Sequence, residues 1–232
     1  MENIEDNLFE EENKLFEEWE KKRPNNFAKD GAAKLYLQSE LKILFVLKET
    51  NKTDETWDSR ERLNEGMMYS SGKPITSTWD NIYCWSKILL SKIVNNFCQA
   101  PKDADERKKI FQKIATMNLK KEPGGTRSNY DEIRNTAIED SDFIKKQIEL
   151  YTPHIIICCG KNLIYNRINA LFQGDKLNYE NQNLRMKHIN ISAAYQTLLI
   201  DYYHPASSKK NDFHHQSMLS IKELLTKNRE LF

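Results

Sequence analysis

The sequence predicts an α/β fold, a three-layer sandwich in which a central, mainly parallel, four-stranded sheet is flanked by helices. Four short apolar runs, at residues 41–47, 110–119, 154–160 and 197–203, have the length and composition of buried strands or lead into one. Helix-length segments separate these runs, which favours parallel strands joined by crossover helices. The 232 residues contain no Gly/Ser-rich or Pro-rich linker. We therefore expect a single domain over residues 1–232, with an N-terminal helical extension at 1–30.

Apolar residues recur at helical spacing in most of the segments outside these strands, which predicts helices there. In residues 7–22 the apolar side chains recur at helical spacing among glutamates and lysines, which predicts an amphipathic helix packed on the body of the protein. Thr78 can cap a helix that runs to about Val94. Further helices are expected at 141–151, 161–172 and 213–228, a helix or surface turn at 102–109, and a short additional strand at 184–192.

Residues 52–77 are polar, contain the chain-breaking Gly66, Gly72 and Pro74, and are too long for a simple connection. They are therefore a candidate substrate-covering loop. Its large apolar residues either contact a ligand or seal the edge of the core, and the sequence leaves both open: Trp57, Met67, Met68 and Tyr69.

The composition limits which binding partners and which cellular location we expect. Thirty-five basic residues nearly balance 34 acidic ones, so any surface for nucleic acid must be local. No stretch of about 18 apolar residues is present, and we expect no membrane partner. The acidic start Met1-Glu-Asn-Ile-Glu-Asp lacks the features of a signal peptide, which predicts a cytoplasmic protein.

The four cysteines have no Cys-x-x-Cys spacing. Cys158 and Cys159 are adjacent on a predicted strand and should point to opposite faces of the sheet. We expect buried reduced thiols and no metal site.

Polar side chains follow three of the predicted strands where each strand ends. Lys48, Glu49 and Asn51 follow the first, Asn118 ends the second, and His204 follows the fourth in a His-Pro step. Parallel strands present their carboxyl ends at one edge of a sheet, which is the usual ligand side of open α/β folds. A carboxylate can orient or deprotonate water, an amide can read the edge of a planar ring, and an imidazole can stabilise developing negative charge. Together these groups suit hydrolysis of a bond to a good leaving group, such as a nucleobase.

The order of these motifs resembles the uracil-DNA glycosylase superfamily, specifically its divergent bacterial branches, over roughly residues 41–210. The family has an apolar first strand followed by a short loop, and Leu44-Phe-Val-Leu-Lys-Glu-Thr-Asn51 of this chain is similar to it. The next strand of the family carries an asparagine and is followed by a basic turn with Pro-Gly and an arginine. The segment Thr116-Met-Asn118-Leu-Lys-Lys-Glu-Pro-Gly-Gly-Thr-Arg127 is similar to this strand and turn. A Pro-x-hydrophobic-strand-Gly segment is matched by residues 153–160, and the closing His-Pro-Ser by His204-Pro205-Ala206-Ser207.

The resemblance implies excision of uracil or another altered base from DNA by hydrolysis of its N-glycosidic bond. Glu49 or Asn51 would orient the water, Asn118 would bind the base, and His204 would stabilise it as it departs. Lys48 and Tyr69 are further candidates for contact with the base. We expect a monomer that binds double- or single-stranded DNA. We expect no cofactor, because this chemistry needs only water, a carboxylate and a group that stabilises an anion. The expected contacts to the nucleic-acid backbone are Lys120, Lys121, Arg127, Lys161, Ser207, Ser208 and Lys209.

The sequence departs from the family pattern at several places. Leu47, Lys48 and Thr50 stand where the first loop of the family has glycine or proline, and Ala206 replaces the common serine. The cluster-binding cysteines of the thermophilic branch are missing. A modified pyrimidine, as in phage DNA, is therefore also a candidate substrate.

The sequence is also compatible with two other functions. One is a catalytically silent nucleic-acid or nucleotide-binding module on the same fold, which is favoured if Glu49 and His204 point away from a common pocket. The other is hydrolysis of a free nucleoside or nucleotide, which is favoured by the lack of a positive channel across the site. Each key residue also has a purely structural alternative: Glu49 can pair with Lys48, Asn118 can satisfy backbone groups, and His204 can be packed in the core.

Overall fold

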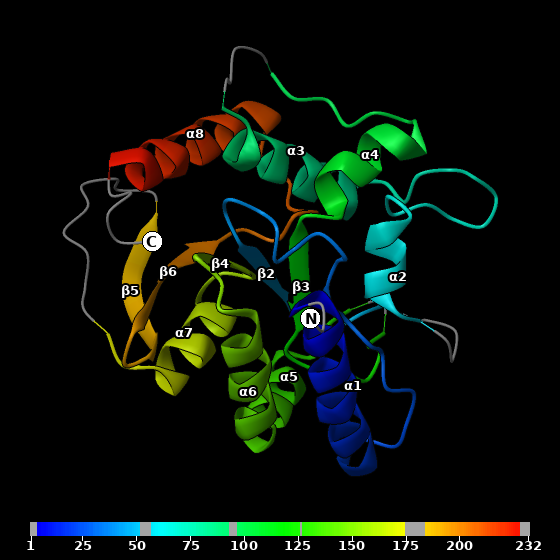
Figure 1. Cartoon of the computed structure of the whole chain (residues 1–232), viewed down its shortest axis with the longest axis vertical. Helices are drawn as coiled ribbons and strands as arrows, with labels where there is room; N and C mark the ends of the chain where they lie inside the picture. Colours follow the sequence, from blue (N-terminus) through cyan, green and yellow to red (C-terminus); the bar gives the residue numbers. More distant parts are fainter. Residues whose placement is uncertain (1–3, 52–56, 93–96, 126, 175–183, 228–232) are drawn as a thin grey trace.

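A computed structural model describes residues 4–51, 57–92, 97–125, 127–174 and 184–227 of the chain. Helices alternate with strands along most of this length (Figure 1). The strands are β1 (Gly31–Ala32), β2 (Ile43–Leu47), β3 (Ile114–Asn118), β4 (Ile155–Cys159), β5 (Arg185–Ser192) and β6 (Tyr195–Tyr202). The helices are α1 (Ile4–Lys22), α2 (Ser59–Asn64), α3 (Thr78–Leu90), α4 (Ala104–Phe111), α5 (Tyr130–Glu139), α6 (Ser141–Tyr151), α7 (Asn162–Leu171) and α8 (Asn211–Lys227).

The strands form one sheet in the order β1-β3-β2-β4-β6-β5. The inner four, β3, β2, β4 and β6, are parallel to one another. Each edge strand is antiparallel: β1 pairs with β3, and β5 pairs with β6. All four parallel strands therefore end at the same edge of the sheet, which we call the carboxyl edge.

Helices cover both faces of the sheet. In Figure 1, α3, α4 and α8 lie on one side of the sheet and α1, α5, α6 and α7 on the other. Two apolar clusters fill these spaces, because alternate strand residues point to opposite faces. Phe45 of β2 packs with residues of α3 and α8, whereas Leu44 and Val46 pack with residues of α1, α6 and α7. Cys158 and Cys159 likewise belong to opposite clusters, as predicted.

The predicted α/β class is confirmed, but the prediction of four strands is wrong. The four predicted apolar runs are the four parallel strands, and two antiparallel edge strands extend the sheet to six. Strand β1 was not predicted, because its two residues, Gly31 and Ala32, contain no apolar run. Strand β5 was predicted, at 184–192.

Helix α5 was also missed. Its buried residues are only Ile133, Thr136 and Ala137, so its apolar stripe is weak. The available signal was a cap, since Oδ1 of Asn129 accepts hydrogen bonds from the N–H groups of Asp131 and Glu132. The N-cap of α3 is Ser77, one residue before the predicted Thr78, and α3 ends at Leu90; residues 93–94 of the predicted helix lie outside the described ranges.

Helix α1 packs against the same core as the sheet. Phe16 and Trp19 are fully buried. The indole N–H of Trp19 donates to Oδ2 of Asp140 at 2.9 Å, and Arg23 forms an ion pair with the same carboxylate. Burial of these two rings is worth several kcal/mol, about 1.5–3 for each large apolar side chain, so α1 contributes substantially to the stability of the fold.

Among the described residues, none of the helices combines the length and the apolar character that crossing a bilayer requires.

Candidate functional site

A cavity of about 660 Å³ lies at the carboxyl edge of the sheet, and we call it the main cavity. Its walls come from the loop after β2, the end of β3, the loop after β6, and residues 57–79 that lead into α3. Cavities of this volume are typical of small-molecule sites in proteins. All six residues predicted to act on or bind the base line it: Lys48, Glu49, Asn51, Tyr69, Asn118 and His204.

The pairing of β2 with β3 places the first two site loops side by side. Leu47 and Asn118 are in register at the ends of these strands. Beyond that pair the backbone hydrogen bonds continue, from the Leu119 N–H to the Leu47 carbonyl and from the Lys120 N–H to the Lys48 carbonyl. The Gly124 N–H then donates to the Thr50 carbonyl at 2.8 Å. The two loops are therefore joined along their length, which fixes the backbone beneath Glu49.

The Glu49 side chain is nearly buried, with 6% of its surface exposed. Its Oε2 lies 3.3 Å from Nζ of Lys120, which also forms an ion pair with Glu132. Burial opposes the charge on Lys120, but the carboxylates of Glu132 and Glu49 outweigh it and raise the pKa of the lysine. A β-carbon at Gly124 would lie only 2.2 Å from the Glu49 carboxyl carbon, so only glycine leaves room for this carboxylate.

Asn118 is held at the end of β3 by a buried carboxylate. Its backbone N–H donates to Oδ2 of Asp30 at 2.6 Å. The residue is 5% exposed and lines the main cavity. A backbone anchored by a charged acceptor gives the amide a fixed starting point, as reading the edge of a planar ring requires.

His204 is neutral at physiological pH. Burial, and then the nearby charge of Lys48, lower the pKa of His204 from 6.5 to about 4. Its Nδ1 accepts a hydrogen bond from the Ala206 N–H at 3.1 Å, which assigns the proton to Nε2. Asn81 of α3 supports this loop, because its Nδ2 donates to the Pro205 carbonyl at 2.7 Å. The ring is thus a neutral donor on the wall of the main cavity.

Three buried polar atoms of the residues lining the main cavity have no hydrogen-bond partner within the described ranges: Oε1 of Glu49, Oγ1 of Thr50 and Nε1 of Trp57. An unmet buried polar group costs about 1–3 kcal/mol. Water or a polar ligand in the main cavity would satisfy these atoms. The carboxylate oxygen accepts, the indole N–H donates and the hydroxyl can do either, which suits a ligand that has both donors and acceptors.

Lys120 and Lys121 do not lie where a phosphate could reach them, which corrects their prediction as backbone contacts. Lys121 is fully buried on the other side of the loop, with Nζ bonded to both carboxylate oxygens of Asp30 and to Oε1 of Gln147. Burial lowers its pKa against the opposing effect of Asp30. Lys120 is 5% exposed and is occupied by Glu49 and Glu132. Both lysines organise the site from within.

The other predicted backbone contacts remain near the surface. Arg127, Lys161, Ser208 and Lys209 are exposed. Lys161 lies with Nζ 3.9 Å from the centroid of the Tyr203 ring. Ser207 is half-buried, and its Oγ is 3.4 Å from Nε2 of His214. Their contact with nucleic acid stays a prediction.

The segment predicted as a covering loop supplies one wall of the main cavity, together with the start of α3. Trp57 and Tyr69 line the cavity, whereas Met67 and Met68 are buried in the core. Residues 52–56 lie outside the described ranges. Sequence reasoning missed the contributions of Thr116, Ser128 and residues 75–79; the positive φ of Ser77, +59°, is a strained conformation that composition does not reveal.

No protein-family model matches the chain, and no curated protein matches it. The resemblance to uracil-DNA glycosylases therefore rests on the motifs quoted above and on their order along the sequence. The geometry of the main cavity is the independent ground on which a function can be argued.

Proposed function

We propose that the protein is a DNA glycosylase-like hydrolase that releases uracil or another altered base from DNA. The base would enter the main cavity after its nucleotide leaves the helix stack. Such extrusion costs a few kcal/mol, and least where the base is damaged or mispaired. The amide of Asn118 would hydrogen-bond the polar edge of the base, with Lys48 and Tyr69 at its periphery.

The reaction breaks the bond between C1′ of the sugar and a ring nitrogen of the base. The electron pair of this bond leaves with the base, and the oxygen of a water molecule bonds to C1′. Glu49 accepts a proton from that water through Oε1, the oxygen that does not face Lys120 and has no partner among the described residues. The neutral His204 donates a hydrogen bond from Nε2 to the anionic base, which then takes up a proton.

One observation supports the proposal above the others. A buried carboxylate, one oxygen of which has no partner within the described ranges, a buried amide and a neutral imidazole donor converge on one cavity from three separate strand ends. A silent binding module would need the amide but neither the free carboxylate oxygen nor the donor histidine. Keeping a carboxylate at 6% exposure with no partner for Oε1 among the described residues costs stability, and a general base is a role that uses this oxygen.

The test is a strand-cleavage assay for abasic sites on oligonucleotides that carry uracil, hypoxanthine or a modified pyrimidine. The wild-type protein is compared with Glu49→Gln, His204→Ala and Asn118→Ala variants. We expect an abasic product with at least one base, reduced by roughly 100-fold or more in the Glu49 and His204 variants.

The matched control is Glu132→Gln, which removes the exposed carboxylate from the same lysine and leaves Glu49 in place. It should keep most of the activity. If none of the bases is released but Asn118→Ala weakens oligonucleotide binding, the protein is a reader of nucleic acid and the roles of Glu49 and His204 are wrong. Release of base from free nucleosides at the same rate as from DNA would instead identify a nucleoside hydrolase.

A further inference from the structure

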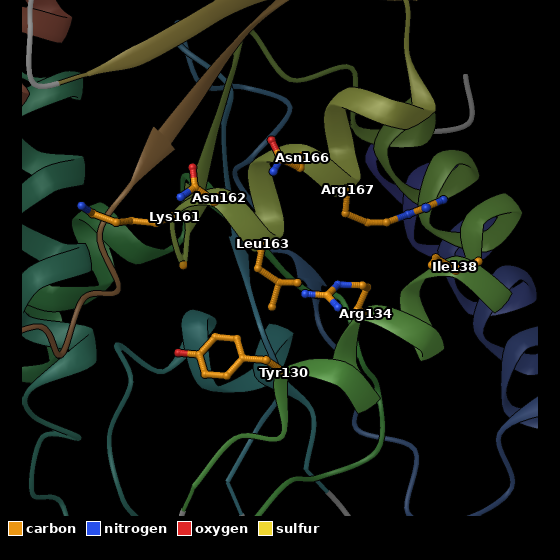
Figure 2. A pocket seen from close by; sticks show the side chains of 9 residues that line it. Tyr130, Arg134, Ile138, Lys161, Asn162, Leu163, Asn166 and Arg167 are labelled. Carbon is orange, nitrogen blue, oxygen red and sulfur yellow. The ribbon is translucent and has the colours of Figure 1, made fainter.

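A second cavity of about 540 Å³ opens beside the main one, and we call it the side cavity (Figure 2). It lies between the start of α5 and α7. Figure 2 shows Arg134 reaching from α5 toward Leu163 of α7, the ring of Tyr130 below them at the start of α5, and Lys161, just before α7, extending away from Arg134. None of the residues found to line the side cavity is acidic, and three are basic: Arg134, Lys161 and Arg167.

Lys48 separates the side cavity from the main cavity. It lines the main cavity, and its ammonium lies 5.0 Å from the centroid of the Tyr130 ring in the side cavity. Its stem passes close to Gly160, where a β-carbon would lie 3.6 Å from Cγ of Lys48. The Lys48 side chain thus borders both cavities. Two ligand groups, one bound in each cavity, would lie on opposite sides of Lys48.

Tyr130 is unusually exposed for an aromatic residue beside a candidate site. About half of its surface, 53%, is open to solvent. An exposed ring among cations is the arrangement that binds unpaired bases, since the base stacks on the ring while the cations contact phosphate. Arg134 is available for such a contact, because its one charged partner within the described ranges is the exposed Asp131 and surface pairs of this kind are weak.

We propose that the side cavity binds the nucleotide next to the one in the main cavity, and that the substrate is single-stranded DNA. The neighbouring base stacks on Tyr130, and its phosphate contacts Arg134. Two adjacent nucleotides are then both out of a duplex stack, which a single strand allows at little cost and a duplex resists. This inference rests on the proposed function for the identity of the ligand, and it adds the form of the DNA.

The test measures binding without requiring turnover. Fluorescence anisotropy gives the Kd of a labelled strand of about 12 nucleotides, alone and annealed to its complement, with no altered base present. The variants are Tyr130→Ala, Tyr130→Phe and Arg134→Ala. Phe97→Ala is the control, because Phe97 is an aromatic residue of matching exposure, 51%, that lines a different cavity.

We expect the wild-type protein to bind the single strand more tightly than the duplex. Tyr130→Ala should weaken single-strand binding by about tenfold or more, whereas Tyr130→Phe and Phe97→Ala should change it by less than about twofold. Arg134→Ala should weaken binding and reduce its salt dependence. Tighter binding to the duplex, or a Kd of Tyr130→Ala equal to that of the wild type, would overturn the proposal.

Running the abasic-site assay on the same proteins separates the two proposals. Base release together with unchanged binding by Tyr130→Ala would refute the side-cavity inference and leave the glycosylase proposal intact. Single-strand binding that depends on Tyr130 without any base release would refute hydrolysis and keep the side cavity as a binding site. Failure to bind either form of DNA, together with no base release, would refute both.

Discussion

Two of the regions in which this protein buries charged side chains differ in whether those charges are satisfied. One is the main cavity at the carboxyl edge of the sheet. The other, which we call the α1 cluster, lies beneath α1 and contains Glu12, Asp30, Lys121, Gln147 and Tyr151, all at most 1% exposed. The α1 cluster lies directly behind the site, since Asp30 also accepts the backbone N–H of Asn118.

The α1 cluster supplies a partner for each of its charges. Lys121 donates to Asp30 and Gln147, and Gln147 donates to Asp30 and to the hydroxyl of Tyr151. Glu12 accepts from Tyr151, from the Ala32 N–H and from Arg60. Gly31 is required here, because its φ of +147° and the 2.0 Å between a β-carbon and Oε1 of Glu12 exclude other residues.

The main cavity, in contrast, leaves Oε1 of Glu49, Oγ1 of Thr50 and Nε1 of Trp57 without partners within the described ranges. Burial of charge is therefore common to both regions and does not by itself identify a functional site. The distinguishing feature is unmet hydrogen-bonding capacity around a space that a ligand can enter.

The strongest test of this contrast is Lys121→Met. The substitution keeps the apolar stem but leaves the Asp30 carboxylate buried without a cation, so we expect the free energy of unfolding to fall by about 3–5 kcal/mol. Chemical denaturation measures this change. Lys14→Met, which removes an exposed lysine on α1, is the control and should have no measurable effect. A loss below about 1 kcal/mol for Lys121→Met would show that the α1 cluster does not depend on its internal ion pair.

Protonation of Glu12 should make the free energy of unfolding depend on pH. Burial raises the pKa of Glu12 from 4.5 to about 7, against the opposing effects of Arg60 and Tyr151. The folded state then holds a proton that the unfolded state has lost, so this residue makes stability fall as pH rises from about 4.5 to about 7, by up to about 3 kcal/mol. Urea unfolding across this range should show the decline in the wild type and a flatter profile in Glu12→Gln. Parallel profiles would contradict the assignment.

Crowding at Glu49 gives a third test, this time of the main cavity. Gly124→Ala places a methyl group against the Glu49 carboxylate, and we expect base release to slow by about 100-fold, because small misplacement of a catalytic group has effects of this size. Gly125→Ala is the control, since its β-carbon would meet nothing closer than 4.0 Å. Neither glycine has a positive φ, so alanine fits the backbone at both. Equal rates for the two variants would place the reactive carboxylate elsewhere.

The smallest expected effect concerns His204. Because its pKa is lowered to about 4, the imidazole stays neutral down to that pH, and base release should not show a loss centred near pH 6.5. The stability that this residue contributes is complete above pH 6.5 and is lost as the pH falls toward 4, because the unfolded chain takes up the proton first. Proton NMR of the ring measures its titration, and Lys48→Met should raise the pKa. A midpoint near 6.5 in the wild type would refute the neutral-donor role.

The amino-acid sequence was sufficient to predict the four parallel strands and the meeting of Glu49, Asn118 and His204. Apolar runs of strand length indicate burial on both faces, and parallel strands must end at one edge. These two regularities are local in the sequence, so they can be recognised without knowledge of any long-range contact. The edge strand β1 and helix α5 lack such regularity and were missed.

Lys120 and Lys121 show what sequence alone does not decide. They are identical neighbours in a loop, yet one pairs with Glu49 in the site and the other with Asp30 beneath α1. Their partners lie 71 and 91 residues away along the chain. Side-chain direction in a loop follows no period, so residue type and spacing cannot assign these pairs.

The sequence by itself therefore determined the fold class and which residues gather at the carboxyl edge. Only the tertiary structure decided which of their polar atoms are satisfied, that Gly124 makes room for Glu49, and that Tyr130 is exposed beside Lys48. The physical reason is that hydrophobic periodicity reports the burial of a segment, whereas hydrogen bonds and ion pairs depend on distances between atoms that only packing brings together.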